Sequence, residues 1–344
     1  MRRNRKSHPG RILIIRLGAL GDVLLTTPLV RSLRSRFPHA EIDFLCKTAA
    51  APLVADNPYI TRVLSFQTGR SGSLGKTIRR VRKKRYDVIV DLQGNIRSIV
   101  ISLLSRCLRC IRSKHFRMRR WFLVKWHLDL YSEIIPVPCR HLKAAAPLGV
   151  RDDREGLDLF VEKEAAKAVQ KMKERYSHHH PEGLIALAPG AGRATKRWPA
   201  DRYGAAARCF EEKGWGIVML GGEDDRETCQ IAAGFLKDPL IPAGNASLSE
   251  TAAWIAAVRL LITNDTGVMH MAAALRTPIV ALFGPTTRHF GFMPFRSKAR
   301  VVETDLPCRP CSCHGTDTCP RGHFNCMMTI SVENVVREAD MLLT

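Results

Sequence analysis

Short apolar runs alternate with segments of helical periodicity along most of this chain. In the first half, the pattern predicts strands at residues 11–17, 41–46, 62–66 and 87–92 and helices at 22–36 and 74–84. In the second half, it predicts strands at 184–188, 216–220, 260–263 and 278–283 and helices at 201–213, 224–236, 247–258 and 331–343. Alternating strands and helices form parallel sheets covered by helices on both faces. We therefore predict an α/β protein with two doubly wound domains.

The length of 344 residues suits two domains of about 150 residues each. Polar stretches at 151–155 and 178–183 bracket the predicted junction, so we expect an N-terminal domain at 1–160 and a C-terminal domain at 161–344. The closing helix at 331–343 is a candidate to pack back on the first domain. Doubly wound sheets bind ligands beyond the carboxyl ends of their strands, which predicts a cleft between two facing domains.

The N-terminal segment is basic and then apolar, as in a signal peptide, but Arg16 and Asp22 interrupt its apolar run. It is better interpreted as a first strand behind a basic tail. No segment offers about 18 uninterrupted apolar residues, so no membrane-spanning helix is expected. These features predict a cytoplasmic protein.

The net charge of +22 is concentrated in the first half of the chain. From residue 92 to residue 128 there is no Asp or Glu, while nine Lys and Arg residues lie beside bulky aromatics. This composition predicts a surface for an anionic acceptor or membrane, made of Arg112, Arg117, Arg119, Arg120 and Trp121. A nucleic acid would suit the same charges, and a solvated basic face without a partner is the third interpretation.

The segment Asn264-Asp265-Thr266-Gly267 lies between a predicted strand and an Ala-rich helical segment. The first N–H groups of a helix lack internal partners, and its dipole favours negative charge. Gly267 lets a ligand approach the backbone closely. The segment is therefore a candidate phosphate-binding loop, although Asp265 or Thr266 could equally be an ordinary helix cap.

Three further loops follow predicted strands. Gly18 to Asp22 does not form a dinucleotide-binding fingerprint, and Asp22 there is either a helix cap or a general base kept ionised by helix N–H groups. The Gly-rich loop at 189–199 carries Lys196, a mobile cation able to reach a diphosphate. Glu223 follows Gly221-Gly222 and either accepts hydrogen bonds from ribose hydroxyls or supplies helix-terminal charge.

The ordered set Ala19-Leu20-Gly21-Asp22, Lys196-Arg197-Trp198-Pro199, Asn264 to His270 and Phe283-Gly284-Pro285-Thr286 resembles glycosyltransferase family 9. The likeness spans nearly the whole chain and is nearer to the second heptosyltransferase of core assembly than to the first. It implies the GT-B fold, with two Rossmann-like domains, and inverting transfer without a metal. It also implies that Asp22 is the catalytic base and that the donor contacts Lys196, Glu223, Asp265, Thr266, Gly267 and His270.

The resemblance implies transfer of a heptose from a nucleotide-diphosphate donor, with ADP-heptose expected, to a phosphorylated lipopolysaccharide core acceptor. It places the protein on the inner face of the inner membrane, with no cofactor needed for catalysis and no nucleic-acid partner. The alternative from another class is a basic nucleic-acid-binding protein with a Cys-ligated zinc. A nicotinamide-dependent oxidoreductase is disfavoured because the GxGxxG pattern is missing.

Five of the eleven cysteines fall within one short segment near the C-terminus. Cys308, Cys311, Cys319 and Cys326 could supply four tetrahedral ligands to a structural zinc, with Cys313, His314 and His323 interleaved. Unligated thiols are the other interpretation, and disulfides are less expected in a reducing compartment.

Overall fold

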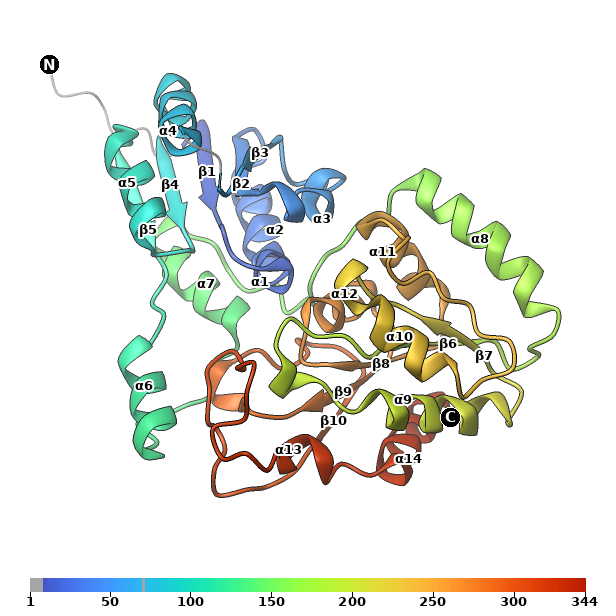
Figure 1. Cartoon of the computed structure of the whole chain (residues 1–344). Coiled ribbons are helices and arrows are strands. Elements are labelled where there is room, and N and C mark those ends of the chain that lie inside the picture. The colour runs from blue at the N-terminus through green and yellow to red at the C-terminus, as the bar shows by residue number, and fades with distance from the viewer. Residues whose placement is uncertain (1–8, 70–71) are drawn as a thin grey trace, which may run out of the picture. The chain divides into compact units, whose positions relative to one another are not determined.

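The computed structural model describes residues 9–69 and 72–344, so most of the predicted basic tail lies outside the described residues. The chain divides into two compact units. The first unit comprises Met1–His115 and Val137–Phe160, and the second comprises Phe116–Pro136 and Val161–Thr344. Each unit contains one five-stranded parallel sheet with flanking helices (Figure 1), which confirms the predicted α/β class.

The sheet of the first unit has the order β3-β2-β1-β4-β5. Its strands are β1 (Arg11–Ile15), β2 (Glu41–Lys47), β3 (Arg62–Phe66), β4 (Val88–Asp91) and β5 (Arg109–Arg112). Its helices are α1 (Leu20–Leu24), α2 (Thr27–Arg36), α3 (Pro52–Ala55), α4 (Ser73–Lys84), α5 (Ile96–Leu104) and α7 (Val137–Ala145). The central strand β1 pairs in parallel with both β2 and β4, so its carboxyl end lies in the middle of one sheet edge.

Both faces of the first sheet are buried, as the apolar strands require. Successive side chains of a strand point to opposite faces, so Ile12 and Ile14 pack with α2 and α7, whereas Leu13 and Ile15 pack with α4 and α5. The predicted helix at 22–36 is two helices, α1 and α2. Pro28 is accommodated because it lies in the first turn of α2, where its missing N–H costs no helical hydrogen bond.

The second unit repeats this plan with the strand order β10-β9-β8-β6-β7. Its strands are β6 (Leu184–Ala188), β7 (Gly216–Met219), β8 (Leu260–Asn264), β9 (Ile279–Phe283) and β10 (Ala299–Glu303). Its helices are α6 (Arg117–Trp126), α8 (Lys163–Ser177), α9 (Ala200–Glu211), α10 (Arg226–Ala233), α11 (Leu248–Ala257), α12 (Gly267–Leu275), α13 (Asn325–Met328) and α14 (Val332–Leu343). Helix α11 begins with a capping box, in which the Ser247 hydroxyl accepts from the Glu250 N–H at 3.1 Å.

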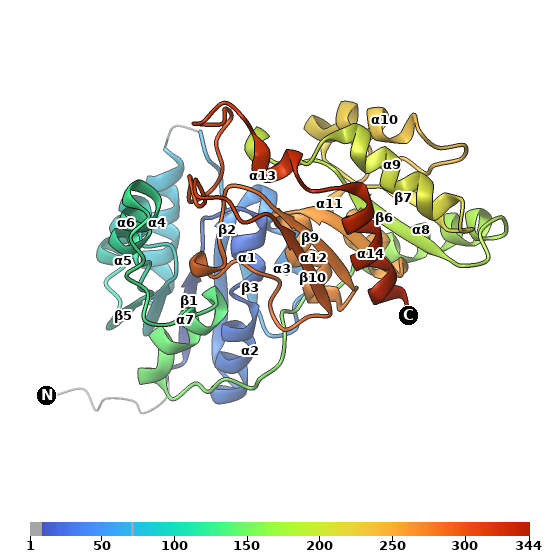
Figure 2. The same ribbon diagram turned by 90° about the horizontal axis from the view of Figure 1, so that it is seen from below.

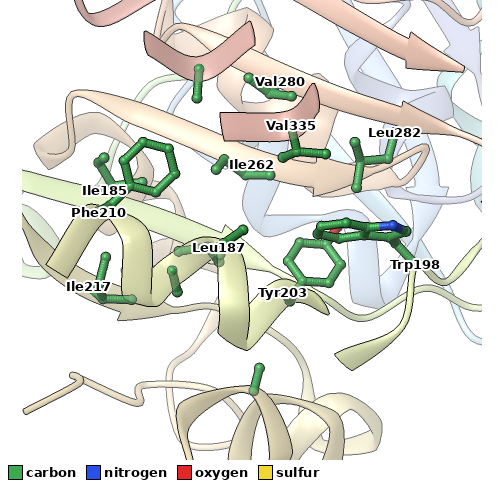
Figure 3. Close-up of a cluster of buried hydrophobic side chains, with 14 of the residues drawn as sticks. Ile185, Leu187, Trp198, Tyr203, Phe210, Ile217, Ile262, Val280, Leu282 and Val335 are labelled. Atoms are coloured by element: carbon green, nitrogen blue, oxygen red, sulfur yellow. The ribbon is translucent and has the colours of Figure 1, made fainter. Parts of the chain in front are cut away.

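One face of the second sheet packs against α9, α10 and α14 around Trp198, Tyr203 and Phe210. Figure 3 shows these rings against Ile185, Leu187 and Leu282 of the sheet, and the Trp198 and Tyr203 rings meet edge to face with their centroids 5.0 Å apart. Helices α8, α11 and α12 lie on the other side. This core anchors the loops that leave the carboxyl ends of β6 and β8.

The structure assigns one segment to a different unit than the predicted domains do. Residues 116–136, including α6, group with the second unit, although they fall within the first half of the chain. The region between the predicted junction stretches contains the 15-residue helix α8, which packs on α11. The closing helix α14 packs on α9 and β10 of its own unit (Figure 2). Within residues 9–69 and 72–344, no helix has the length and apolarity needed to cross a membrane.

Candidate active site

Asp22 lies where the central strand of the first unit gives way to α1. One carboxylate oxygen, Oδ2, accepts a hydrogen bond from the Ala19 N–H at 3.1 Å, which is the contact expected of a helix cap. The other oxygen, Oδ1, lies 2.7 Å from Nη2 of Arg16. A side chain on residue 18 would collide with this carboxylate, since an ideal Cβ on Gly18 would lie 2.3 Å from Oδ2. Both oxygens of Asp22 are therefore held in a fixed orientation, with 24% of the side chain exposed.

Arg16 is the residue of this site that the sequence reasoning missed as a functional group. Its side chain is only 8% exposed, and its Nη1 donates to the Leu92 carbonyl, which follows β4. The guanidinium thus spans from the edge of the sheet to Asp22. The sequence signal that could have identified Arg16 is its position as a lone charge after an apolar strand. A buried arginine requires an acceptor or an acidic partner, so a partner such as Asp22 could have been expected.

A fully buried carboxylate, Asp91, ends the neighbouring strand β4. Asp91 accepts hydrogen bonds from the N–H groups of Gln93 and Gly94, each at 3.0 Å, and from the Ser98 hydroxyl at 3.0 Å. Arg112 at the end of β5 lies 3.7 Å from Asp91. The Asp91 carboxylate therefore organises the β4–α5 turn, and one of the predicted surface cations is paired with it.

His141 of α7 lies buried beside these groups. Its Nδ1 is 3.1 Å from the Ser113 hydroxyl. Burial lowers the pKa of His141 well below its usual value, and the positive charges of Arg16, His115 and Arg140 act in the same direction. His141 is therefore a neutral imidazole at neutral pH. Nothing in the local sequence distinguishes it from an ordinary helical histidine.

In the second unit, Lys196 and Asp265 meet at the carboxyl ends of β6 and β8. Lys196 Nζ lies 2.7 Å from Asp265 Oδ2 and donates to the Asp265 carbonyl at 3.2 Å. Thr286, which follows β9, donates its hydroxyl to the same Oδ2 at 2.9 Å. Three loops predicted separately from the sequence thus converge on one carboxylate, and a cation is held at the edge of the sheet.

Asn264 and Trp198 fix the loop that carries Lys196. The Asn264 side-chain amide donates to the Pro189 carbonyl at 2.8 Å, and its oxygen accepts from the Trp198 N–H at 3.1 Å. The fully buried Trp198 indole donates to the Ile330 carbonyl at 3.1 Å. Truncating an indole buried to this extent costs about 3–5 kcal/mol, so Trp198 is a strong anchor for the loop.

The predicted phosphate-binding loop has the expected local structure. Thr266 is the extended N-cap residue of α12, and Gly267 is the first residue of that helix. Met269 and His270 are the third and fourth residues of α12, and both are buried. The first N–H groups of α12 therefore begin directly after Asp265, beside the ammonium of Lys196.

Glu223 lies exposed in the short turn Glu223–Asp225 that follows β7. Its neighbour Asp225 points back toward the sheet instead, and an ideal Cβ on Gly190 would lie 2.0 Å from Asp225 Cγ. Gly190 is thus required by a side chain of the protein itself. An ideal Cβ on Gly192 would meet nothing within 4 Å, so this part of the loop has open space beside it.

The sequence pattern of glycosyltransferase family 9 (heptosyltransferase) matches residues 74–319. The chain belongs to this family. Over 308 residues it is 27% identical to lipopolysaccharide heptosyltransferase 2 of Escherichia coli K12, covering 85% of this chain and 87% of that protein. The match confirms the predicted family and a glycosyltransferase enzyme, and it does not favour the nucleic-acid-binding alternative.

Solved structures of the family share the fold. A family 9 glycosyltransferase from Veillonella parvula DSM 2008 superimposes with a TM-score of 0.81 at 26% identity, covering 97% of both chains. The E. coli ADP-heptose lipopolysaccharide heptosyltransferase II superimposes with a TM-score of 0.75 at 24% identity, covering 97% of this chain and 98% of that one. These likenesses confirm the predicted GT-B class of fold with two Rossmann-like units.

The residues predicted for the acceptor and membrane surface of this family 9 member do not belong to one unit. Arg112 belongs to the first unit, whereas Arg117, Arg119, Arg120 and Trp121 belong to α6 of the second unit. The Arg120 guanidinium lies 5.8 and 5.4 Å from the ring centroids of Phe290 and Phe292, so it packs on its own unit. The Trp121 side chain is exposed and in edge contact with Trp126.

Of the four cysteines predicted as zinc ligands, Cys308, Cys311 and Cys319 lie between β10 and α13, and Cys326 lies in α13. Burial and the neighbouring thiols Cys311, Cys319 and Cys308 raise the pKa of Cys326 to about 11. Cys308 Sγ lies 3.9 Å from Nε2 of His323. Among the described residues, however, no three His, Cys, Asp or Glu side chains are placed so that they could hold a metal ion. In the geometry described here, the thiols are close to one another but do not form a ligand set.

Proposed function

We propose that this protein is an inverting heptosyltransferase that transfers a heptose from ADP-heptose to a lipopolysaccharide core acceptor. The observation that carries the proposal is the Lys196–Asp265 pair. Lys196 Nζ is held 2.7 Å from Asp265 Oδ2, and Asp265 directly precedes the N-cap residue of α12. Such an arrangement suits the diphosphate of a nucleotide sugar. The relatives named above, a lipopolysaccharide heptosyltransferase 2 and an ADP-heptose heptosyltransferase, support this choice of donor and acceptor.

In the proposed reaction, Asp22 takes the proton from an acceptor hydroxyl as that oxygen attacks the anomeric carbon of the donor. A new bond forms between the anomeric carbon and the acceptor oxygen. The bond to the diphosphate breaks and leaves its electron pair on the diphosphate. The attack comes from the side opposite the leaving group, so the configuration is inverted.

The second unit would stabilise the departing group. Negative charge grows on the diphosphate as the bond breaks, and Lys196 with the first N–H groups of α12 would act as fixed donors toward it. Glu223 would accept hydrogen bonds from the ribose hydroxyls, Asp265 would contact the sugar, and His270 would lie near the donor. Lys196 and the first N–H groups of α12 would supply the positive potential that a metal would otherwise provide, so the proposal requires no cofactor for catalysis.

A direct test combines donor identification with the base variant. The purified protein is incubated with ADP-heptose or other nucleotide sugars and with heptose-deficient core lipopolysaccharide, and the product is followed by mass spectrometry. We expect transfer only from the heptose donor. Asp22→Ala is expected to reduce turnover by orders of magnitude with ADP affinity nearly unchanged, because the base does not bind the nucleotide. Normal turnover in that variant would remove Asp22 from the mechanism.

We further propose that the enzyme works in the cytoplasm, peripherally bound to the anionic inner face of the inner membrane. The cations Arg117 and Arg119 and the exposed Trp121 of α6 suit such a surface. At about 1 kcal/mol per cation, Arg117→Ala with Arg119→Ala should weaken binding to phosphatidylglycerol vesicles about 30-fold. Replacement of Lys171 and Arg175 of α8 is the matched control, and equal binding of both double variants would contradict the proposal.

A structural zinc held by Cys308, Cys311, Cys319 and Cys326 remains a proposal, which the described geometry does not fit without rearrangement of the thiols. Four thiolates of one segment are a suitable donor set for zinc. Metal analysis of the purified protein tests the idea. One equivalent of zinc that is lost in Cys308→Ser with Cys311→Ser would support it, and metal-free protein in which Cys308, Cys311, Cys319 and Cys326 all react as free thiols would contradict it.

A further inference from the structure

The segment between β10 and α13, residues 304–324, is hydrogen-bonded to the loop that carries Lys196. We name it the cysteine-rich segment. The Thr195 N–H and hydroxyl both donate to the Thr316 carbonyl, at 3.0 and 2.8 Å. In return, the Thr316 N–H donates to the Thr195 hydroxyl at 2.7 Å. Thr195 is buried, so these bonds join two loops that are 121 residues apart in the sequence.

At Gly315, the backbone of the same segment packs against the side chain of Lys196. Its φ of +81° lies in the left-handed region that favours glycine. An ideal Cβ at this position would lie 3.0 Å from Cγ of Lys196 and 3.0 Å from Cβ of Arg193. The backbone of Gly315 therefore lies directly against the aliphatic stem of the lysine, and a methyl group at this position would require Lys196 and Arg193 to move by a few tenths of an ångström.

The cysteine-rich segment also reaches the loop that follows β9. Arg309 donates to the carbonyls of Gly284 and Thr286, and it is held by Glu303 at 2.7 Å. The Cys311 N–H donates to the Pro285 carbonyl at 3.2 Å. Since the Thr286 hydroxyl donates to Asp265, the segment contacts the loops on both sides of the Lys196–Asp265 pair.

We propose that the cysteine-rich segment positions the donor-binding cation, with Gly315 and Thr316 as positioning residues for Lys196. A lysine side chain carries up to about 2 kcal/mol of rotamer entropy, which is lost when the ammonium is fixed on a diphosphate. Packing of its stem against Gly315 restricts the side chain before the ligand arrives, which reduces that loss on binding. This inference rests on the proposed function of Lys196 as a ligand of the donor diphosphate.

Two glycines of the same segment provide a matched test. Gly315 and Gly322 both have positive φ, +81° and +73°, but an ideal Cβ at Gly322 meets nothing within 4 Å. Gly315→Ala and Gly322→Ala therefore introduce similar backbone strain, and only the first touches Lys196. We expect Gly315→Ala to weaken binding of ADP and of inorganic pyrophosphate about tenfold by calorimetry. Gly322→Ala should stay within about twofold of the parent, with similar melting temperatures for both variants.

A second pair keeps the test decisive if Gly315→Ala does not fold. Thr195→Val removes the hydroxyl that bonds Thr316, whereas Thr195→Ser retains it. Weaker pyrophosphate binding in Thr195→Val and normal binding in Thr195→Ser is the expected result. Equal affinities in both the glycine pair and the threonine pair would overturn the proposal.

The variant Lys196→Ala distinguishes a failure of the proposed donor site from a failure of the proposed positioning role. If it leaves pyrophosphate and ADP affinity unchanged, the proposed donor site itself is wrong. If Lys196→Ala weakens binding while Gly315→Ala and Thr195→Val do not, the donor site stands and only the positioning role fails.

Discussion

The Arg16–Asp22 pair should contribute measurably to the stability of the first unit. Arg16→Met removes the guanidinium that pairs with Asp22 Oδ1, while the hydrogen bond from the Ala19 N–H to Oδ2 is retained. Removing one partner of a buried ion pair costs about 3–5 kcal/mol. Because Asp22 keeps 24% of its side-chain exposure, we expect the lower end of that range, about 3 kcal/mol.

A double-mutant cycle isolates the interaction from the packing of the arginine stem. Asp22→Asn keeps the size of the side chain and removes its charge. A charge-assisted hydrogen bond contributes about 1.5–3 kcal/mol, so the coupling energy between Arg16→Met and Asp22→Asn should be about 2 kcal/mol. A coupling below about 0.3 kcal/mol would show that the two side chains are neighbours without energetic consequence.

The tryptophans make the assay specific to one unit. All five lie in the second unit, at positions 121, 126, 198, 215 and 254. In urea titrations, fluorescence therefore follows the second unit, while far-UV circular dichroism follows both units. The Arg16→Met destabilisation should appear as an earlier dichroism transition with an unchanged fluorescence midpoint. A shift of the fluorescence midpoint alone would refute the assignment of the pair to the first unit's stability.

Two further outcomes concern pH and a helix cap. The pKa of His141 is depressed in the folded protein, so below a pH of about 6.5 the unfolded chain binds a proton that the folded chain does not. The contribution of His141 to stability is therefore complete above that pH, and the free energy of unfolding should fall by about 1.4 kcal/mol at pH 5.5. The variant His141→Gln should lack this pH dependence when unfolding is followed by circular dichroism. Parallel pH curves for the two proteins would contradict this. Ser247→Ala removes the acceptor for the Glu250 N–H and should cost about 1 kcal/mol in the fluorescence-detected transition, so an unchanged midpoint would show that the cap is energetically silent.

The sequence was sufficient for the central strands and for the loops that leave them, because these strands are buried on both faces and form continuous apolar runs. It was insufficient for β5, whose sequence Arg-Cys-Ile-Arg buries only Ile111 at the edge of the sheet. Helix α8 was concealed by its charge, although Ala165, Val169 and Tyr176 follow helical spacing and could have revealed it.

The candidate site was predictable one loop at a time but not as a set of contacts. Sequence patterns located Lys196 and Asp265 separately, since each follows a strand. Their 2.7 Å contact depends on how β6 and β8 pair, which local periodicity does not specify. The bonds between Thr195 and Thr316 join distant loops through backbone groups, which every residue possesses, so no residue pattern marks them.

The path of the chain between the two units has a practical consequence. The polypeptide passes from one unit to the other three times, after His115, after Pro136 and after Phe160. A protease cut or a gene truncation at residue 160 would leave α6 on a fragment that lacks Phe290 and Phe292, against which Arg120 packs. Exchange of one half between members of the family would therefore have to carry residues 116–136 along with the C-terminal portion, as two separate pieces of gene.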